Sequence, residues 1–227
     1  MTFTLESVVP WGRTFNEYVS MFALSSQDLK LNILGISDGP ASFNAEATAQ
    51  GVKVLSIDPL YSYSALEIQE QFSKTKSTII EQIQSNQSEF SWITFSSIDG
   101  LVQAREQAMK LFIEDFTSEY SNPRYLTSSL PLLPLEDQEF DLSLCSHFLF
   151  LYSLQHDREF HVKSIKEMCR VSKQSRIFPV LELGAKESRH LSAVRAELES
   201  EGYDTELKKV PYEVQKGGNQ MLCVQRA

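Results

Sequence analysis

Residues 31–59 constrain the fold of this chain more than any other stretch. Two apolar runs, 31–36 and 52–57, flank a segment with helical character, 42–50. Turn-forming residues separate the three segments, and a glycine follows the helical one, as is common at helix ends. Strand, turn, helix and strand in this order predict a βαβ unit, which is the building block of a doubly wound α/β sheet.

The turn and the end of the second run carry residues suited to bind a ligand. Gly39 has no Cβ, so a ligand can approach the main chain closely there. Ser42 is placed to cap the following helix, whose free first-turn amides attract a negative or polar group. Asp58 lies 19 positions after Gly39, where a carboxylate can accept both hydroxyls of a ribose. We therefore predict a nucleoside site; the alternative is an ordinary βαβ unit with a solvated aspartate before a turn.

Two families use this layout. The dinucleotide pattern G-x-G-x-x-G is matched poorly, which disfavours a nicotinamide-dependent oxidoreductase. The segment ILGISDGPASF resembles motif I of class I S-adenosylmethionine-dependent methyltransferases, in which an acid and G-x-G-x-G follow an apolar strand. Gly39 matches the central glycine, and Asp58 matches the ribose-binding acid. The chain departs from the motif at Gly35, Ser37 and Ala41, which replace the acid, the first glycine and the last glycine.

The resemblance implies further contacts with S-adenosylmethionine. A helix near the N-terminus often lies across the cofactor in these methyltransferases, and Thr14 and Glu17 have the capping-box spacing of a helix over 13–24. Arg13 would then face the cofactor carboxylate; the alternative is a packed helix with a surface arginine. The residues expected to contact the cofactor around the two motif positions are Ser37, Asp38, Gly39, Asp58 and Pro59.

The segment 129–141, SLPLLPLEDQEFD, carries the second part of the resemblance. Many small-molecule methyltransferases have an acid, then L-P and F-D, at this place. Ser129 stands where the family has the acid near the adenine amino group, and Leu130 would pack on the base. A serine hydroxyl can still accept a hydrogen bond, although more weakly than a carboxylate does.

Ser146 and His147 end the fourth predicted strand, 140–146. Ligands of a doubly wound sheet meet the carboxyl ends of its strands, so both residues should lie opposite the end of the first strand. Ser146 is therefore a further predicted cofactor contact. His147 is the candidate general base, because histidine titrates near neutral pH and can take a proton from an attacking oxygen or nitrogen. Methyl transfer by positioning alone, with a capping or core histidine, is the alternative.

The remaining elements complete the predicted fold. Helical segments fill 62–120, which we interpret as an insertion that caps the substrate, covers the sheet or forms the face of a homodimer. Strands are predicted over 125–129, 176–181, 205–211 and 221–225. The resemblance implies that the last two form an antiparallel hairpin. The resemblance implies that the fold class is α/β, a Rossmann-like class I methyltransferase fold whose seven-stranded sheet is mostly parallel with an antiparallel last strand.

Composition limits the function. The chain has 227 residues, which predicts one methyltransferase-like domain over 1–227. Its net charge of -9 without a basic run argues against a nucleic-acid partner, and no apolar run is long enough to cross a membrane. The absence of a signal-like start and the three scattered cysteines predict a reducing cytoplasm and no metal site. We expect a methyltransferase for a small-molecule acceptor; the alternative is a degenerate domain with a binding or regulatory role.

Overall fold

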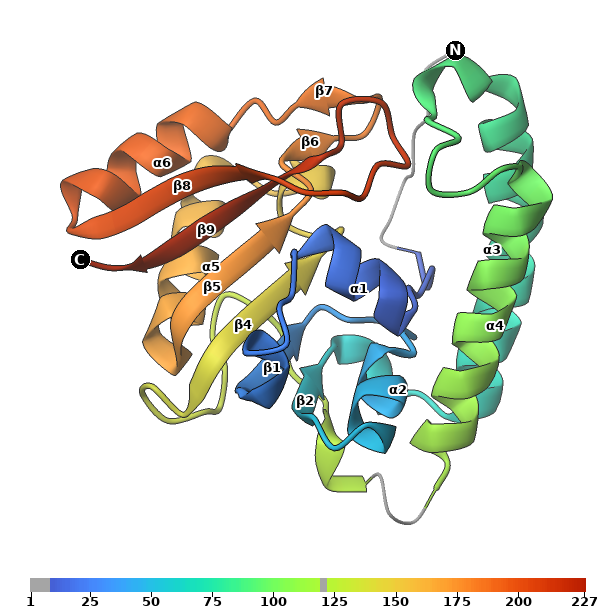
Figure 1. Cartoon of the computed structure of the whole chain (residues 1–227), viewed down its shortest axis with the longest axis horizontal. Helices are drawn as coiled ribbons and strands as arrows, with labels where there is room; N and C mark the ends of the chain where they lie inside the picture. The colour runs from blue at the N-terminus through green and yellow to red at the C-terminus, as the bar shows by residue number, and fades with distance from the viewer. Residues whose placement is uncertain (1–8, 119–121) are drawn as a thin grey trace.

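The computed structural model describes residues 9–118 and 122–227, and a seven-stranded sheet lies at its centre with helices on both faces (Figure 1). The strands of this sheet are β1 (Asn32–Ile36), β2 (Lys53–Ile57), β3 (Tyr125–Leu126), β4 (Phe140–Ser146), β5 (Ser172–Phe178), β8 (Tyr203–Lys209) and β9 (Gln220–Arg226), and a small separate sheet pairs β6 (Leu181–Glu182) with β7 (Lys186–Glu187). The α-helices are α1 (Phe15–Met21), α2 (Phe43–Ala49), α3 (Ala65–Ser85), α4 (Ile98–Phe116), α5 (Arg158–Val171) and α6 (Leu191–Ser200). Short 3-10 helices are η1 (Asp28–Lys30), η2 (Pro59–Ser62), η3 (Gln87–Glu89), η4 (Asn122–Arg124) and η5 (Phe150–Tyr152).

The order of the strands confirms the predicted fold class. The sheet reads β3-β2-β1-β4-β5-β9-β8, and its pairs are parallel except those between β9 and its two neighbours. This is the Rossmann-like class I methyltransferase arrangement, in which an antiparallel last strand is inserted beside a parallel sheet. The chain changes direction across the sheet between β1 and β4, so the carboxyl ends of these strands flank the crevice where such sheets bind ligands.

Several element boundaries differ from the predictions. The fifth strand, predicted over 176–181, runs over Ser172–Phe178 and ends before Pro179, because proline has no amide to donate to a strand ladder. The strand predicted over 125–129 pairs with β2 through two residues only. The predicted helix over 13–24 is shorter at both ends, although its capping box is present.

The alternating side chains of β1 divide the core between the two faces of the sheet. Ile33 packs with α1 and α2, whereas Leu34 and Ile36 pack on the opposite face with α5 and α6. Burial of each such aliphatic side chain stabilises the fold by about 1.5–3 kcal/mol. Gly35 therefore points toward the face that α1 and α2 cover, next to the end of the strand.

Helices α3 and α4 lie beyond the carboxyl ends of β4 and β5 and pack against each other (Figure 1). Their shared apolar cluster is anchored to the sheet by Tyr61 and Tyr125, whose ring centroids lie 5.4–6.0 Å from those of Phe112 and Phe116. α4 ends at Phe116, and the end predicted at Tyr120 lies outside the described residues. The two helices are thus fixed to the β2–β3 edge at their base.

The far end of this helical pair is tied to the loop between β8 and β9. The amide of Ser91 donates to the carbonyl of Val214 (2.7 Å), and the hydroxyl of Thr94 donates to the carbonyl of Glu213 (2.9 Å). The helices therefore span from one side of the sheet to the other. Among the described residues no helix is long and apolar enough to cross a membrane. Cys145, Cys169 and Cys223 are buried and free.

Candidate functional site

A pocket of about 720 Å³ opens at the carboxyl ends of β1, β2 and β4, between the sheet and helices α3 and α4. This volume suits a small organic ligand. The structure brings nearly all of the sequence-predicted site residues to its wall. Leu130 is the exception: it is buried in the core that α5 and α6 cover and does not line the pocket. The predicted residues that do line it are Arg13, Ser37, Asp38, Gly39, Asp58, Pro59, Ser129, Ser146 and His147.

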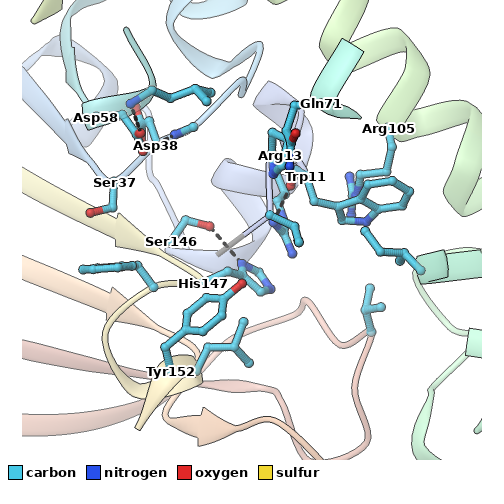
Figure 2. A pocket seen from close by; sticks show the side chains of 18 of the residues that line it. Trp11, Arg13, Ser37, Asp38, Asp58, Gln71, Arg105, Ser146, His147 and Tyr152 are labelled. Atoms are coloured by element: carbon cyan, nitrogen blue, oxygen red, sulfur yellow. Dashed lines mark hydrogen bonds between the residues drawn. The ribbon is translucent and has the colours of Figure 1, made fainter. Parts of the chain in front are cut away.

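The charged groups of the pocket are separated along its length. Figure 2 shows Asp38 and Asp58 at one end and Arg13 and Arg105 at the other, with His147 between them. The pocket thus has an acidic end over β1 and β2 and a basic end toward α4.

Asp58 organises the acidic end. Its Oδ2 accepts a hydrogen bond from the amide of Gly39 (2.8 Å), and its Oδ1 accepts one from the amide of Leu60 (2.7 Å). Burial raises the pKa of this carboxyl, and the two amide hydrogen bonds oppose the rise. Each carboxylate oxygen keeps a further lone pair, so Asp58 can still accept two hydroxyl groups from a ligand.

The turn after β1 has the left-handed backbone that glycines favour. Ser37 has φ of 55° and Gly39 has φ of 54°. At Gly39 a Cβ would meet nothing within 4 Å, so the main chain is open to the pocket. At Ser37, which replaces the first glycine of motif I, the same conformation costs a residue with a Cβ roughly 1–2 kcal/mol. This energetic cost is concentrated at the pocket wall, where strained residues are often functional.

The N-terminus of α2 is closed, which corrects the predicted role of its amides. Ser42 makes no capping bond; its hydroxyl donates to Glu46, and its own amide donates to the carbonyl of Arg13 (3.0 Å). Gly12 lies so close to Pro40 that a Cβ would be 2.0 Å from its carbonyl oxygen. The segment before α1 therefore covers this helix end, and in this turn the main chain is open to the pocket at Gly39 instead.

Asp38 takes the space that the motif I acid would need. An ideal Cβ on Gly35 would lie 1.8 Å from Asp38 Oδ2, so the carboxyl group of Asp38 folds directly over Gly35. The hydroxyl of Tyr18 donates to its Oδ1 (2.7 Å), and that of Ser56 donates to its Oδ2 (2.7 Å). Burial, with a further contribution from the charge of Asp58, raises the pKa of Asp38 to about 6 against these hydrogen bonds. The acid missing at position 35 is thus replaced in space by one at position 38.

Ser146 and His147 lie between the two ends of the pocket. His147 has φ of 52°, its amide donates to the carbonyl of Phe178 (2.6 Å), and its Nδ1 lies 2.9 Å from Ser146 Oγ. Burial, together with the charges of Arg13 and Arg105, holds the pKa of His147 well below its usual range. The imidazole is therefore neutral at physiological pH, the form in which a histidine can accept a proton.

Arg13 carries an uncompensated charge. Its guanidinium donates to the carbonyl of Trp11, and within the described residues its Nε is buried without a hydrogen-bond partner and no acid forms an ion pair with it. Burial and the neighbouring Arg105 lower the pKa of Arg13. A half-buried guanidinium in this state is suited to receive an anionic group of a ligand.

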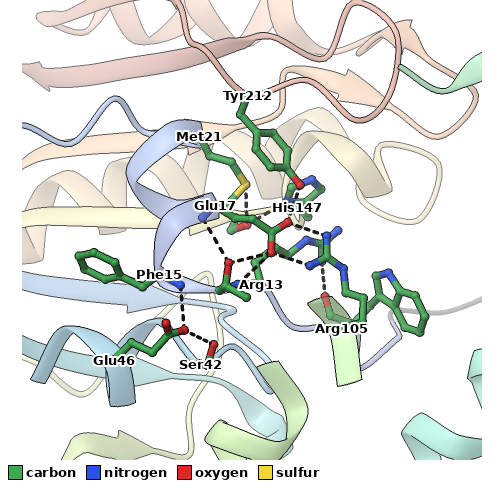
Figure 3. A network of polar contacts seen from close by, with 12 residues as sticks. Arg13, Phe15, Glu17, Met21, Ser42, Glu46, Arg105, His147 and Tyr212 are labelled. Carbon is green, nitrogen blue, oxygen red and sulfur yellow. Dashed lines mark hydrogen bonds and ion pairs between the residues drawn. The ribbon is translucent and has the colours of Figure 1, made fainter. Parts of the chain in front are cut away.

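Arg105 is not among the residues predicted from the sequence. It lies on α4, forms a bidentate ion pair with Glu17 (2.6 Å for both bonds), and is 1% exposed. The hydroxyl of Tyr212 donates to the same carboxylate (2.7 Å), so α1, α4 and the loop after β8 meet in one network (Figure 3). The sequence does contain a sign that Arg105 is buried, because Arg105 follows Leu101 by one helical turn on the apolar face of α4.

The comparisons with known proteins give one relative by sequence. The chain is 34% identical over 223 residues to the uncharacterized protein MJ0045 of Methanocaldococcus jannaschii, which covers 98% of both chains. No family model matches.

Among solved structures, the chain resembles the PH0226 protein of Pyrococcus horikoshii (TM-score 0.49, 12% identity, 94% of this chain and 91% of that one). It also resembles a SAM-dependent methyltransferase of Aquifex aeolicus (TM-score 0.44, 16% identity, 92% of each chain). A third similar structure is the magnesium protoporphyrin IX methyltransferase of Synechocystis PCC 6803 with bound SAM (TM-score 0.47, 14% identity, 94% and 78%). These likenesses are distant, so the fold assignment depends on the strand order described above.

Proposed function

The chain belongs to the family of the Methanocaldococcus jannaschii protein MJ0045, and we propose that it is an S-adenosylmethionine-dependent methyltransferase with a small-molecule acceptor. The observation that carries this proposal is the open crevice at the switch point of a sheet with this strand order. There the carboxylate of Asp58 lies beside the open main chain of Gly39 and accepts a hydrogen bond from its amide.

The residues of the pocket fit the cofactor. Asp58 has free lone pairs for the ribose hydroxyls, and Ser129 lines the pocket where the adenine amino group would lie. Arg13, with its orphaned Nε, would receive the carboxylate of the methionine end, and Asp38 would face its ammonium group. We propose Ser37, Pro59 and Ser146 as further lining contacts. Leu130 is buried away from the pocket and is not retained.

His147 is the proposed general base, acting through Nε2. The hydroxyl of Ser146 donates to Met21 Sδ (3.9 Å), so Ser146 Oγ is free to accept from the Nδ1–H of His147. This tautomer leaves a lone pair on Nε2, which makes no hydrogen bond within the described part of the chain. S-adenosylmethionine supplies an electrophilic methyl group on sulfur, to which a lone pair of the acceptor bonds as the carbon–sulfur bond breaks. His147 then holds the proton that the acceptor loses.

The helical pair α3–α4 is proposed as a cap over the acceptor. Both helices contribute lining residues, and their far end is hydrogen-bonded to the β8–β9 loop on the other side of the opening. Such a cap excludes water from the region beside His147, which strengthens electrostatic interactions with the reacting groups.

Calorimetric titration with S-adenosylmethionine and S-adenosylhomocysteine tests the proposal. We expect saturable binding of both compounds with 1:1 stoichiometry. If neither binds at millimolar concentration, the methyltransferase proposal fails, and the degenerate binding domain becomes the better interpretation. Sedimentation would then be expected to show a stable complex formed through α3 and α4.

Asp58→Asn should weaken cofactor binding by about 10- to 100-fold, because a hydrogen bond to a charged group contributes about 1.5–3 kcal/mol. Asp157→Asn is the matched control. Asp157 also caps a helix, by accepting a hydrogen bond from the amide of Phe160 (2.8 Å), but it lies outside the pocket. Calorimetry on both variants, with melting curves to confirm folding, measures the difference. Equal affinities of the two variants would remove Asp58 from the site.

His147 should remain neutral where an ordinary histidine titrates. Folding lowers the pKa of His147 below the usual 6.5, so the unfolded state binds a proton more readily as pH falls. The free energy of unfolding should therefore decrease as pH falls below 6.5. NMR of the imidazole should show a neutral ring with a proton on Nδ1 as pH is lowered through 6.5. His147→Asn identifies the signal, since asparagine tolerates the left-handed backbone at this position. A titration centred near 6.5 in the folded protein would contradict the proposed burial of the ring.

A further inference from the structure

The part of the pocket beyond His147 differs in chemistry from the nucleoside end. Its walls come from α3, α4, the segment before α1 and the β8–β9 loop, and the side chains there are mainly apolar. We call this region the acceptor compartment and define it by the apolar lining residues Trp11, Ile68, Ile79, Ile83, Leu101 and Val214. Most of them are less than 10% exposed, so the compartment suits the apolar body of a ligand.

The charges at the inner end of this compartment are predominantly positive. Arg13 and Arg105 are both present, and the single carboxylate among them, Glu17, is fully engaged by Arg105 and Tyr212. Two guanidinium groups and one carboxylate leave a net charge of +1 close to His147. In the protein without cofactor Arg13 provides this excess, since it has no ion pair among the described residues. In the proposed complex the cofactor carboxylate would pair with Arg13, and the cofactor sulfonium would keep the net charge beside the acceptor at +1.

The acids of the pocket are placed where they cannot serve a cationic acceptor. Asp38 and Asp58 lie at the nucleoside end and hold hydrogen bonds there. Glu67 and Glu70 are exposed at the mouth, where Glu67 caps α3 and Glu70 lies 3.6 Å from Lys74. Within the described residues, no carboxylate is thus available beside His147 to balance an ammonium group.

From this arrangement we propose that the acceptor is an apolar molecule that is methylated on an acidic oxygen rather than on an amine. The acidic oxygen belongs to a phenolic hydroxyl or to a carboxyl group. Positive charge beside the reacting atom favours an oxyanion there. A carboxylate is already ionised at neutral pH, whereas a phenolate would form as the O–H proton moves to His147 Nε2. The same charge disfavours a protonated amine, which would bring a second cation into a buried space. The inference depends on the proposed methyl transfer for its reaction, whereas the ligand preference follows from the compartment alone.

Calorimetry of the protein without cofactor, using three naphthalene probes, tests this preference. The probes share one apolar body: 2-naphthol is neutral at pH 7, 2-naphthoate is an anion, and 2-(aminomethyl)naphthalene is a cation. We expect the naphthol and the naphthoate to bind at least about 10-fold tighter than the amine, equivalent to about 1.4 kcal/mol. Equal or tighter binding of the amine, or no binding of any probe, would overturn the proposal.

A charge introduced into the wall provides a second readout. Val214→Glu places a carboxylate in the acceptor compartment and should reduce or reverse the preference against the amine. Val102→Glu is the matched control, because Val102 is also half-buried but lies outside the pocket. If both variants change the preference equally, the compartment does not determine it. Since these titrations contain no S-adenosylmethionine, failure of cofactor binding and failure of this inference are separate results.

Discussion

Gly35→Ala should destabilise the protein by about 3 kcal/mol, at the upper end of what overpacking a core position costs. The added Cβ would lie 1.8 Å from Asp38 Oδ2, and the carboxyl group cannot move away freely because Tyr18 and Ser56 both donate to it. Displacing Asp38 would also leave these two buried hydroxyls without their acceptor. Chemical denaturation of the variant and the unaltered protein measures the difference.

Two further variants make this prediction specific. Gly51→Ala is the matched control: Gly51 has φ of 83° and open space around it, so it should lose only about 1 kcal/mol through backbone strain. Asp38→Ala removes the group that the new methyl would strike. In a double-mutant cycle, Gly35→Ala should therefore cost much less in the Asp38→Ala background than alone. Additive effects would show that Asp38 does not occupy the space over Gly35.

Arg105→Met should destabilise the protein by about 3–5 kcal/mol, because it leaves Glu17 buried without its ion partner. The methionine fills most of the space of the arginine stem, so the loss reflects the unpaired carboxylate rather than a cavity. Replacing both partners, as Arg105→Met with Glu17→Leu, should recover much of the loss. Denaturation of the three proteins tests this; a double variant as unstable as the single one would contradict it.

The same ion pair predicts how stability depends on pH. Burial alone would raise the pKa of Glu17, but the charge and hydrogen bonds of Arg105 and the amide of Thr14 lower it to about 2 from 4.5. A carboxyl whose pKa is depressed by folding stabilises the protein fully above its unfolded value. About 3 kcal/mol should therefore be lost as pH falls from 4.5 toward 2. In the variant with both Arg105→Met and Glu17→Leu, this decrease in the free energy of unfolding at low pH should disappear.

Much of the fold and of the site was predictable from local sequence pattern. Strands β1, β2 and β4 are short apolar runs with clear ends, and Asp58 and His147 follow two of them directly. Because parallel strands bring their carboxyl ends to one edge, these residues converge on one pocket once the strand order is known. The same reasoning fails for Leu130, which was predicted to contact the cofactor but is buried in the core. The residues after β3 form an irregular turn, so no periodic pattern shows which of them point inward.

The amino-acid order by itself predicted the short strands β1, β2 and β4 and a crevice at their carboxyl ends, because strand periodicity and turn residues are local properties. The antiparallel last strand was expected from the resemblance to a family. Only the tertiary structure decided that Asp38 takes the place of an acid at position 35, that the N-terminus of α2 is covered, and that Arg105 meets Glu17 across 88 positions of sequence. Those contacts join segments far apart in the chain, and which side chains meet there depends on how helices pack over a sheet. No local pattern records that packing.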